Sequence, residues 1–137
     1  MVSDYNIVDY SSFKRDIIKE LSEACHRNGL KFGVYYSQAQ DWDEPDAPYI
    51  APRLEGTRAF IHPDLPADFK PNMDRYIAKK SLPQVEELMK NYGIDLIWFD
   101  TPSGMNMERV KVFSDMVRKH RPDCLINSRI IHKGKGQ

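Results

Sequence analysis

The sequence has no long hydrophobic stretch and no excess of one charge. Its longest apolar run spans only a few residues, and the N-terminal "MVSDYNIVDY" lacks the basic and apolar regions of a signal peptide, so we expect neither a membrane span nor an export signal in this chain. Twenty basic residues balance twenty acidic ones, which leaves no bulk field to attract nucleic acid or an anionic membrane. With 41% hydrophobic and 29% charged residues, the composition predicts one ordinary soluble domain.

Residues that could bind metals or cofactors are sparse. Cys25 and Cys124 occur without CxxC spacing or a neighbouring histidine cluster, which predicts buried free thiols rather than a disulfide or a metal site. The four histidines lie far apart, without ligand spacing. Neither GxGxxG nor GxxxxGK[ST] occurs among the few glycines, which argues against a phosphate-binding loop. The sequence therefore predicts no metal and no cofactor.

Three segments have the period of amphipathic helices. The first is predicted over residues 12 to 28, with Ser11 as a possible N-cap and Gly29 at the C′ position. The second, "SLPQVEELMKNYG", has Ser81 and Gln84 in capping-box spacing, and Pro83 predicts a kink or restart after any shorter helix that precedes it. The third is marked by apolar residues at helical spacing: Val110, Phe113 and Val117.

Three apolar segments follow helices and read as strands buried on both faces: residues 31–37 ("KFGVYYS"), the run "IDLIWFD" and residues 124–128 ("CLINS"). Alternating helices and strands imply right-handed crossovers and a parallel sheet covered on both sides. Residues 38–74 hold most of the nine prolines and no sustained period, so we expect a long functional loop there.

Three parallel strands with two open edges make a poor closed unit. A complete (β/α)8 barrel needs about 250 residues. A flavodoxin-like domain would fit the length better, but it usually has a glycine-rich phosphate loop after its first strand. We therefore expect residues 1–137 to be the central fragment of a single catalytic (β/α)8 TIM barrel domain, α/β in class and incomplete at both ends.

In such barrels the reactive groups lie at the carboxyl ends of the strands. Strand alternation places Trp98 and Asp100 on the same side, and an aromatic ring beside a carboxylate suits a sugar substrate. The residues alone leave other interpretations open. Asp100 before Thr-Pro could be only a turn or capping residue, the tyrosines at 35 and 36 could be core or rim aromatics, and Arg129 could be a solvated charge.

The loop after the first predicted strand carries an acidic run: Asp41, Asp43, Glu44 and Asp46. We expect this run to be a solvated loop rather than a metal site.

The order of these motifs resembles the middle of the catalytic barrel of retaining α-L-fucosidases, glycoside hydrolase family twenty-nine. The similarity covers most of the chain and is carried by "YNIVD", "GLKFGVYYSQAQDW", "LPQVEELMKNYGIDLIWFD" and "LINSR". The block "YGIDLIWFD" is the most specific of them.

The resemblance implies hydrolysis of terminal α-L-fucosyl residues of glycans or glycoconjugates through a covalent fucosyl-enzyme. It implies that Asp100 is the nucleophile, that Trp98 lines the fucose pocket, and that Arg129 and Tyr35, with Tyr36 as the alternative, contact the sugar. It also implies that the general acid/base lies past residue 137 and that paired histidines lie before residue 1, so that the chain alone is inactive.

Glu44 or Glu55 could be proposed as the acid, but nothing in their setting favours them. A non-catalytic sugar-binding barrel and a barrel glycosidase of other specificity remain as alternatives. The resemblance gives no compartment beyond a family that is commonly secreted, periplasmic or lysosomal.

Overall fold

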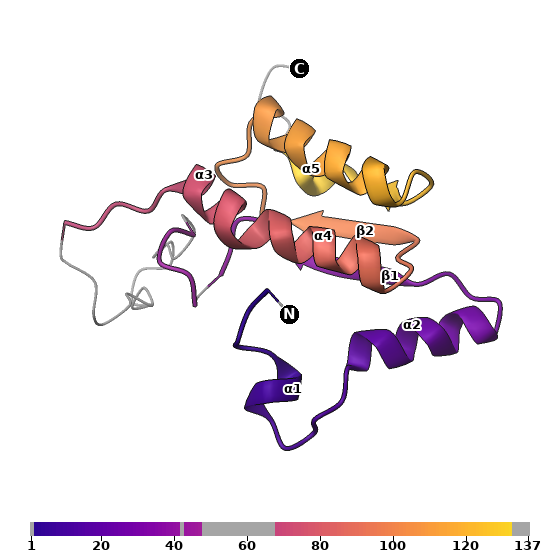
Figure 1. Cartoon of the computed structure of the whole chain (residues 1–137). Helices are drawn as coiled ribbons and strands as arrows, with labels where there is room; N and C mark the ends of the chain where they lie inside the picture. Colours follow the sequence, from indigo (N-terminus) through magenta and orange to yellow (C-terminus); the bar gives the residue numbers. More distant parts are fainter. Residues whose placement is uncertain (1, 42, 48–67, 133–137) are drawn as a thin grey trace, which may run out of the picture.

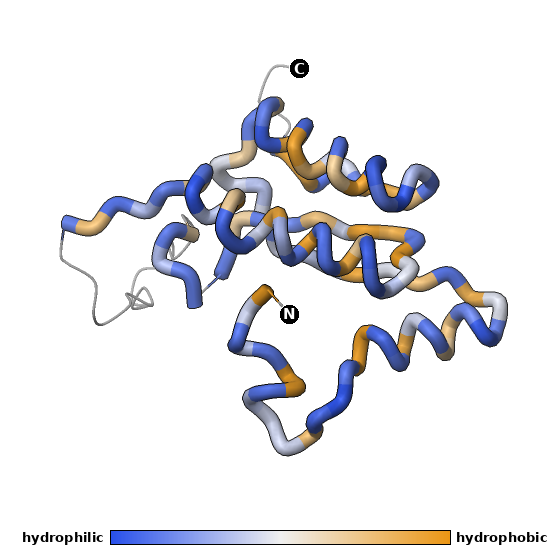
Figure 2. The backbone as a smooth tube through the Cα atoms, in the orientation of Figure 1, coloured by the Kyte–Doolittle hydropathy of each residue, from blue (hydrophilic) through white to orange (hydrophobic). Residues whose placement is uncertain are grey.

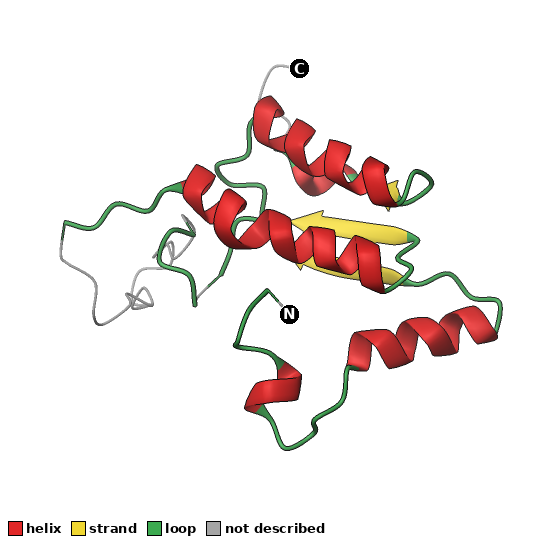
Figure 3. Ribbon diagram, viewed as in Figure 1, coloured by secondary structure: helices red, strands yellow, loops and turns green. Residues whose placement is uncertain are grey.

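The computed structural model describes residues 2–41, 43–47 and 68–132, and its centre is a parallel sheet (Figures 1 and 3). The strands are β1 (Gly33–Ser37), β2 (Leu96–Asp100) and β3 (Leu125–Ile126), hydrogen-bonded in the order β1-β2-β3. The predicted order of long helices and strands is confirmed. The central strand β2 is the one that ends on Asp100.

Helices α4 (Leu82–Asn91) and α5 (Met107–His120) cover one face of the sheet. On that face they pack against the buried side chains of β2. Phe99 of β2 is fully buried, with its ring centroid 5.7 Å from that of Phe113 of α5 and 6.3 Å from that of Tyr36 of β1. Burying a side chain of this size stabilises the fold by roughly 2–3 kcal/mol. Figure 2 shows hydrophobic residues concentrated along β2, where this core lies.

The opposite face of the sheet is open in the described part of the chain. Tyr35, Trp98 and Leu125 point to this face and are 61%, 45% and 64% exposed. The predictions of strands buried on both faces and of helices on both sides are therefore wrong for these residues. The reason is topological, because successive right-handed crossovers along the order β1-β2-β3 place α4 and α5 on one face.

The predicted helix over residues 12–28 begins later, as α2 (Ile17–Arg27), after a short helix α1 (Ile7–Tyr10). Lys14 has a left-handed φ of 52°, which interrupts the helical path, and the N-cap is Asp16 rather than Ser11. The predicted end is confirmed. Gly29, with φ of 72°, donates its N–H to the carbonyl of His26, and Leu30 donates its N–H to the carbonyl of Cys25. These two bonds end the helix in a Schellman motif.

The helix before β2 does not restart at Pro83, where we predicted a kink or restart. Helix α3 (Met73–Tyr76) runs through a π-helical turn, η1 (Ile77–Ser81), into α4, and Ser81 is a buried helical residue that makes no capping bond. The N–H of Leu82 bonds to the carbonyl of Ile77, five residues back. A wider π turn gives the ring of Pro83 room, so the proline is accommodated without ending the helix.

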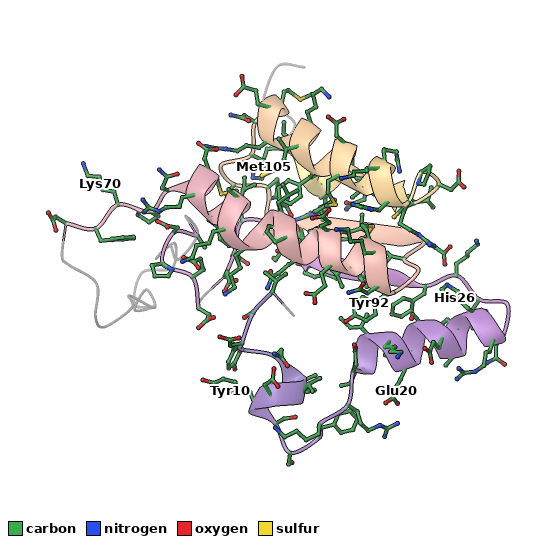
Figure 4. All side chains as sticks on the ribbon, in the orientation of Figure 1. Tyr10, Glu20, His26, Lys70, Tyr92 and Met105 are labelled. Carbon is green, nitrogen blue, oxygen red and sulfur yellow. The ribbon has the colours of Figure 1, made fainter. Side chains whose placement is uncertain are left out.

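Helix α2 is tied to the rest of the molecule by polar contacts near its two ends. Figure 4 shows Tyr92 at the end of α4 extending toward α2, where its hydroxyl donates to Asp16 at 2.9 Å. At the other end, His26 lies 3.1 Å from Asp95, the residue that precedes β2. No helix within the described ranges combines the length and apolar character needed to cross a membrane.

Candidate active site

Asp100 occupies the carboxyl end of β2 on the open face, and both of its carboxylate oxygens accept hydrogen bonds. The Tyr35 hydroxyl donates to Oδ2 at 2.6 Å. The backbone N–H of Thr101 donates to Oδ1 at 2.8 Å, and Arg129 Nε donates to the same oxygen at 2.7 Å. The Tyr35 hydroxyl, the Thr101 N–H and the Arg129 guanidinium, in that order, hold the pKa of Asp100 below its usual range. The carboxylate is therefore ionised at neutral pH.

The structure brings three of the predicted site residues together around Asp100. Tyr35 pairs in register with Trp98, so both aromatic side chains lie on the open face, one pleat before the carboxylate. Arg129 reaches the carboxylate from the segment after β3 with a second nitrogen, Nη2, as well as Nε. The candidate nucleophile therefore lies at the open face of the sheet together with the side chains of Tyr35, Trp98 and Arg129.

Tyr36 lies on the other face of β1. Its hydroxyl donates to Gln84 Oε1 at 2.8 Å within the core beneath α4, and burial raises its pKa well above the ordinary value. Because Tyr36 does not share the face of Asp100, the geometry favours Tyr35 as the tyrosine of this site.

The position of Arg129 depends on two amide side chains to which the sequence analysis assigned no role. Asn127 accepts the N–H of Phe99 at 2.8 Å and donates to the carbonyl of Phe99 at 3.0 Å. At this position the Asn127 side chain, and not its backbone, makes the hydrogen bonds to β2. The strand β3 is therefore shorter than the predicted 124–128. The chain then turns into the 3-10 helix η2 (Ser128–Ile130), where Gln38, fully buried, donates to the carbonyls of Arg129 and Ile130 at 3.2 and 3.3 Å.

The acidic run after β1 is an ion-pair network and not the solvated loop we predicted. Lys80 Nζ lies 2.9 Å from Asp41 and 3.0 Å from Asp43, and Arg75 pairs with Asp46. Glu44 is buried and 3.3 Å from Lys79 Nζ, so its carboxylate is engaged by a cation on η1. These pairs fix the first part of the loop onto α3 and η1. Glu55, the other carboxyl considered as an acid, lies outside the described residues.

Within residues 2–41, 43–47 and 68–132, no group of three or more histidine, cysteine or acidic side chains has the geometry to hold a metal ion. His120 is 2.9 Å from Glu86 on α4, a contact between two neighbouring helices. Both cysteines are free thiols, as predicted, although only Cys124 is buried and Cys25 is partly exposed.

Comparisons with known proteins show the family of the chain. The family model for α-L-fucosidase matches residues 1–137. The chain is 31% identical to plasma α-L-fucosidase of Homo sapiens over 102 residues, which are 74% of this chain and 18% of the human protein.

Among solved structures, AlfC, an α-L-fucosidase from Lactobacillus casei in complex with its α-L-fucose product, is similar with a TM-score of 0.82 and 42% identity, over 98% of this chain and 42% of that one. The α-L-fucosidase of Vibrio sp. strain EJY3 is similar with a TM-score of 0.77 and 33% identity, over 96% of this chain and 22% of that one.

The parallel strands with helices on one face, together with the similarity to AlfC, define the class of the chain as a partial α/β barrel. Within that class, the chain belongs to the α-L-fucosidase family. It spans about a fifth of the length of the curated relatives and less than half of AlfC.

Proposed function

We propose that this chain supplies the nucleophile and part of the sugar-binding surface of a retaining α-L-fucosidase acting on terminal α-L-fucosyl residues of glycans or glycoconjugates. One observation carries the proposal: an ionised Asp100, held by three donors, faces open space at the end of a barrel strand beside Trp98. An ionised carboxylate beside an aromatic side chain is suited to attack the anomeric carbon of a pyranose.

The reaction would proceed in two displacements. A lone pair of an Asp100 oxygen forms a bond to C1 while the bond from C1 to the leaving oxygen breaks, and that oxygen takes a proton from a carboxylic acid on the other side of the sugar. The carboxylate left by that proton transfer then accepts a proton from water, whose oxygen attacks C1, breaks the bond to Asp100 and releases fucose. In retaining enzymes the two carboxyl groups are about 5 Å apart.

The other site residues have separate roles in this proposal. The Trp98 ring offers an apolar surface to the sugar ring. Arg129, already hydrogen-bonded to Asp100, favours the ionised form of the carboxyl and keeps nitrogen donors for a sugar hydroxyl. The Tyr35 hydroxyl donates to Asp100 in the free site and can turn to the ring oxygen or a hydroxyl once the ester forms. AlfC supports the substrate class, since an aspartate-to-alanine variant of it was captured with 4-nitrophenyl-α-L-fucopyranoside.

We further propose that residues 1–137 form the central portion of one catalytic barrel, with the general acid/base outside this chain. The open face of Tyr35, Trp98 and Leu125 would line the barrel interior, because side chains of that parity point inward in a closed barrel. The partial coverage of AlfC agrees with this interpretation.

The test uses the full-length protein that contains this chain and an aryl α-L-fucoside as substrate. Asp100→Gly should lower kcat by at least about 1000-fold, and azide should restore part of the rate by taking the place of the missing carboxylate. Asp115→Asn is the matched control, because this aspartate pairs with Lys111 on the exposed surface of α5. Equal, poor hydrolysis by wild type and Asp100→Gly would instead support a sugar-binding protein without catalysis. A panel of aryl glycosides on which another sugar is preferred would contradict the substrate assignment.

A further inference from the structure

The residue after the nucleophile has an unusual backbone. Thr101 has φ of 55°, in the left-handed region, and in the part of the chain that the structure describes only Lys14 shares this property among non-glycine residues. A β-branched side chain is strained there, because its Cβ substituents crowd the backbone. Strained positions of this kind persist only where the surrounding structure holds them, and they gather at functional sites.

Hydrogen bonds at Thr101 tie it to both strands of the site. Its hydroxyl donates to the carbonyl of Asp100 at 2.6 Å and lies 3.0 Å from the hydroxyl of Ser37. Ser37 is the register partner of Asp100 on β1. A chain of hydroxyls therefore joins the end of β1 to the backbone of the nucleophile, and the left-handed turn aims the N–H of Thr101 back at Asp100 Oδ1.

The contacts of the two carboxylate oxygens differ as a result. Oδ1 accepts from Thr101 N–H and from Arg129, whereas the one side-chain partner of Oδ2 that we find in the described residues is the Tyr35 hydroxyl. We propose that Thr101 is a positioning residue that fixes the rotamer of Asp100, so that Oδ1 stays bound by two donors and Oδ2 is presented to the sugar. This inference rests on the proposed nucleophilic role of Asp100.

Strain and function can be separated by choice of substitution. Thr101→Gly relieves the left-handed backbone and removes both hydroxyl contacts, so the stability of the fold should stay the same or rise while the carboxylate becomes less ordered. Both variants keep the N–H of residue 101, and Thr101→Ser also keeps the hydroxyl. Lys14→Gly is the matched control, because it relieves the same kind of backbone strain in the exposed connection before α2.

The experiment measures kcat, KM and the pH profile of the full-length protein with an aryl α-L-fucoside, together with the melting temperature. For Thr101→Gly we expect kcat to fall about tenfold with KM changed less than about twofold, since a misplaced reacting group costs rate more than binding. The acid limb of kcat/KM should move to higher pH, because a less ordered Asp100 is held less firmly by the hydrogen bonds, that of the retained N–H of residue 101 among them, that lower its pKa. Thr101→Ser and Lys14→Gly should resemble wild type in kcat, in KM and in the pH profile.

A second readout is independent of turnover. In protein labelled with carboxyl ¹³C aspartate, the Asp100 resonance should titrate at higher pH in Thr101→Gly than in wild type. An unmoved titration, or a kcat within about twofold of wild type, would overturn the positioning role, and so would an equal loss in Thr101→Ser. If wild type hydrolysed no fucoside, the proposed function would fail, and the titration would still decide whether Thr101 orders Asp100.

Discussion

Asn127 gives a sharp test of how the site is built, because its side chain makes two hydrogen bonds to the backbone of β2, the strand that ends on Asp100. Its Oδ1 accepts the Phe99 N–H at 2.8 Å and its Nδ2 donates to the Phe99 carbonyl at 3.0 Å. Asn127→Ala removes both. Each such bond contributes about 1 kcal/mol net, and a partner group left unsatisfied costs about 1–3 kcal/mol. Phe99 itself is fully buried.

We therefore expect Asn127→Ala to lower the free energy of unfolding by about 2–4 kcal/mol. The assay is urea unfolding of the full-length protein, followed by tryptophan fluorescence. Activity should fall as well, since the same segment sets the path from β3 to Arg129 and the same backbone leads into Asp100. A change in unfolding free energy below about 0.5 kcal/mol would refute the reasoning.

Asn127→Asp separates hydrogen bonding from shape, because it is nearly isosteric. At neutral pH the second carboxylate oxygen would face the Phe99 carbonyl, so a donor is replaced by a second acceptor and the variant should be at least as unstable as Asn127→Ala. Below the pKa of the new carboxyl, its O–H can donate to that carbonyl. Stability relative to wild type should therefore recover as pH falls, and a difference from wild type that stays constant with pH would contradict this account.

Three further predictions concern the scaffold. Lys80→Met should destabilise the fold by about 2 kcal/mol in urea unfolding and release the loop after β1, because two carboxylates lose their shared partner. Gly93→Ala should cost more than Gly29→Ala by the same measurement. Both glycines are left-handed, but a Cβ at Gly93 would lie 2.9 Å from His26 and one at Gly29 would meet nothing within 4 Å. The pKa of Asp95 is lowered to about 2, first by a backbone N–H bond, so about 2 kcal/mol of stability is present above pH 4 and is lost as pH falls toward 2. Asp95→Asn should flatten stability against pH in that window.

The order of elements could be predicted because apolar period and strand length are local properties. The ends of the helices were harder to predict from the sequence than their order. Gly29 was found because a C′ position needs a positive φ, which glycine supplies. The start of α2 was missed because Phe13 continues the apolar period although the backbone at Lys14 leaves the helix. Pro83 predicted a kink or restart, and the structure instead has a π turn before it, for which the sequence has no local signal.

Strand parity was the most informative signal for the site. It placed Trp98 and Asp100 on one face, which the structure confirms, and the same alternation puts Tyr35 on that face and Tyr36 on the other. The ion pairs of the acidic loop could not be predicted in this way. Four carboxylates close in sequence suggest a solvated segment, but their cations, Lys79, Lys80 and Arg75, lie more than twenty residues away and come close only after folding.

Asn127 and Thr101, whose side chains hydrogen-bond to the backbone at the end of β2, had no signal of their own for a related reason. Asn127 acts through backbone atoms of another strand, and Thr101 acts through a φ angle that its side chain disfavours. Neither a propensity nor a period reports such a role, because each depends on what the partner segment offers. Strain at Thr101 has to be offset by its bonds to Ser37 and Asp100, so the two strand ends and the turn are determined together. A threonine after an aspartate at a strand end is unremarkable as sequence. It becomes informative only when the backbone on which it sits is known.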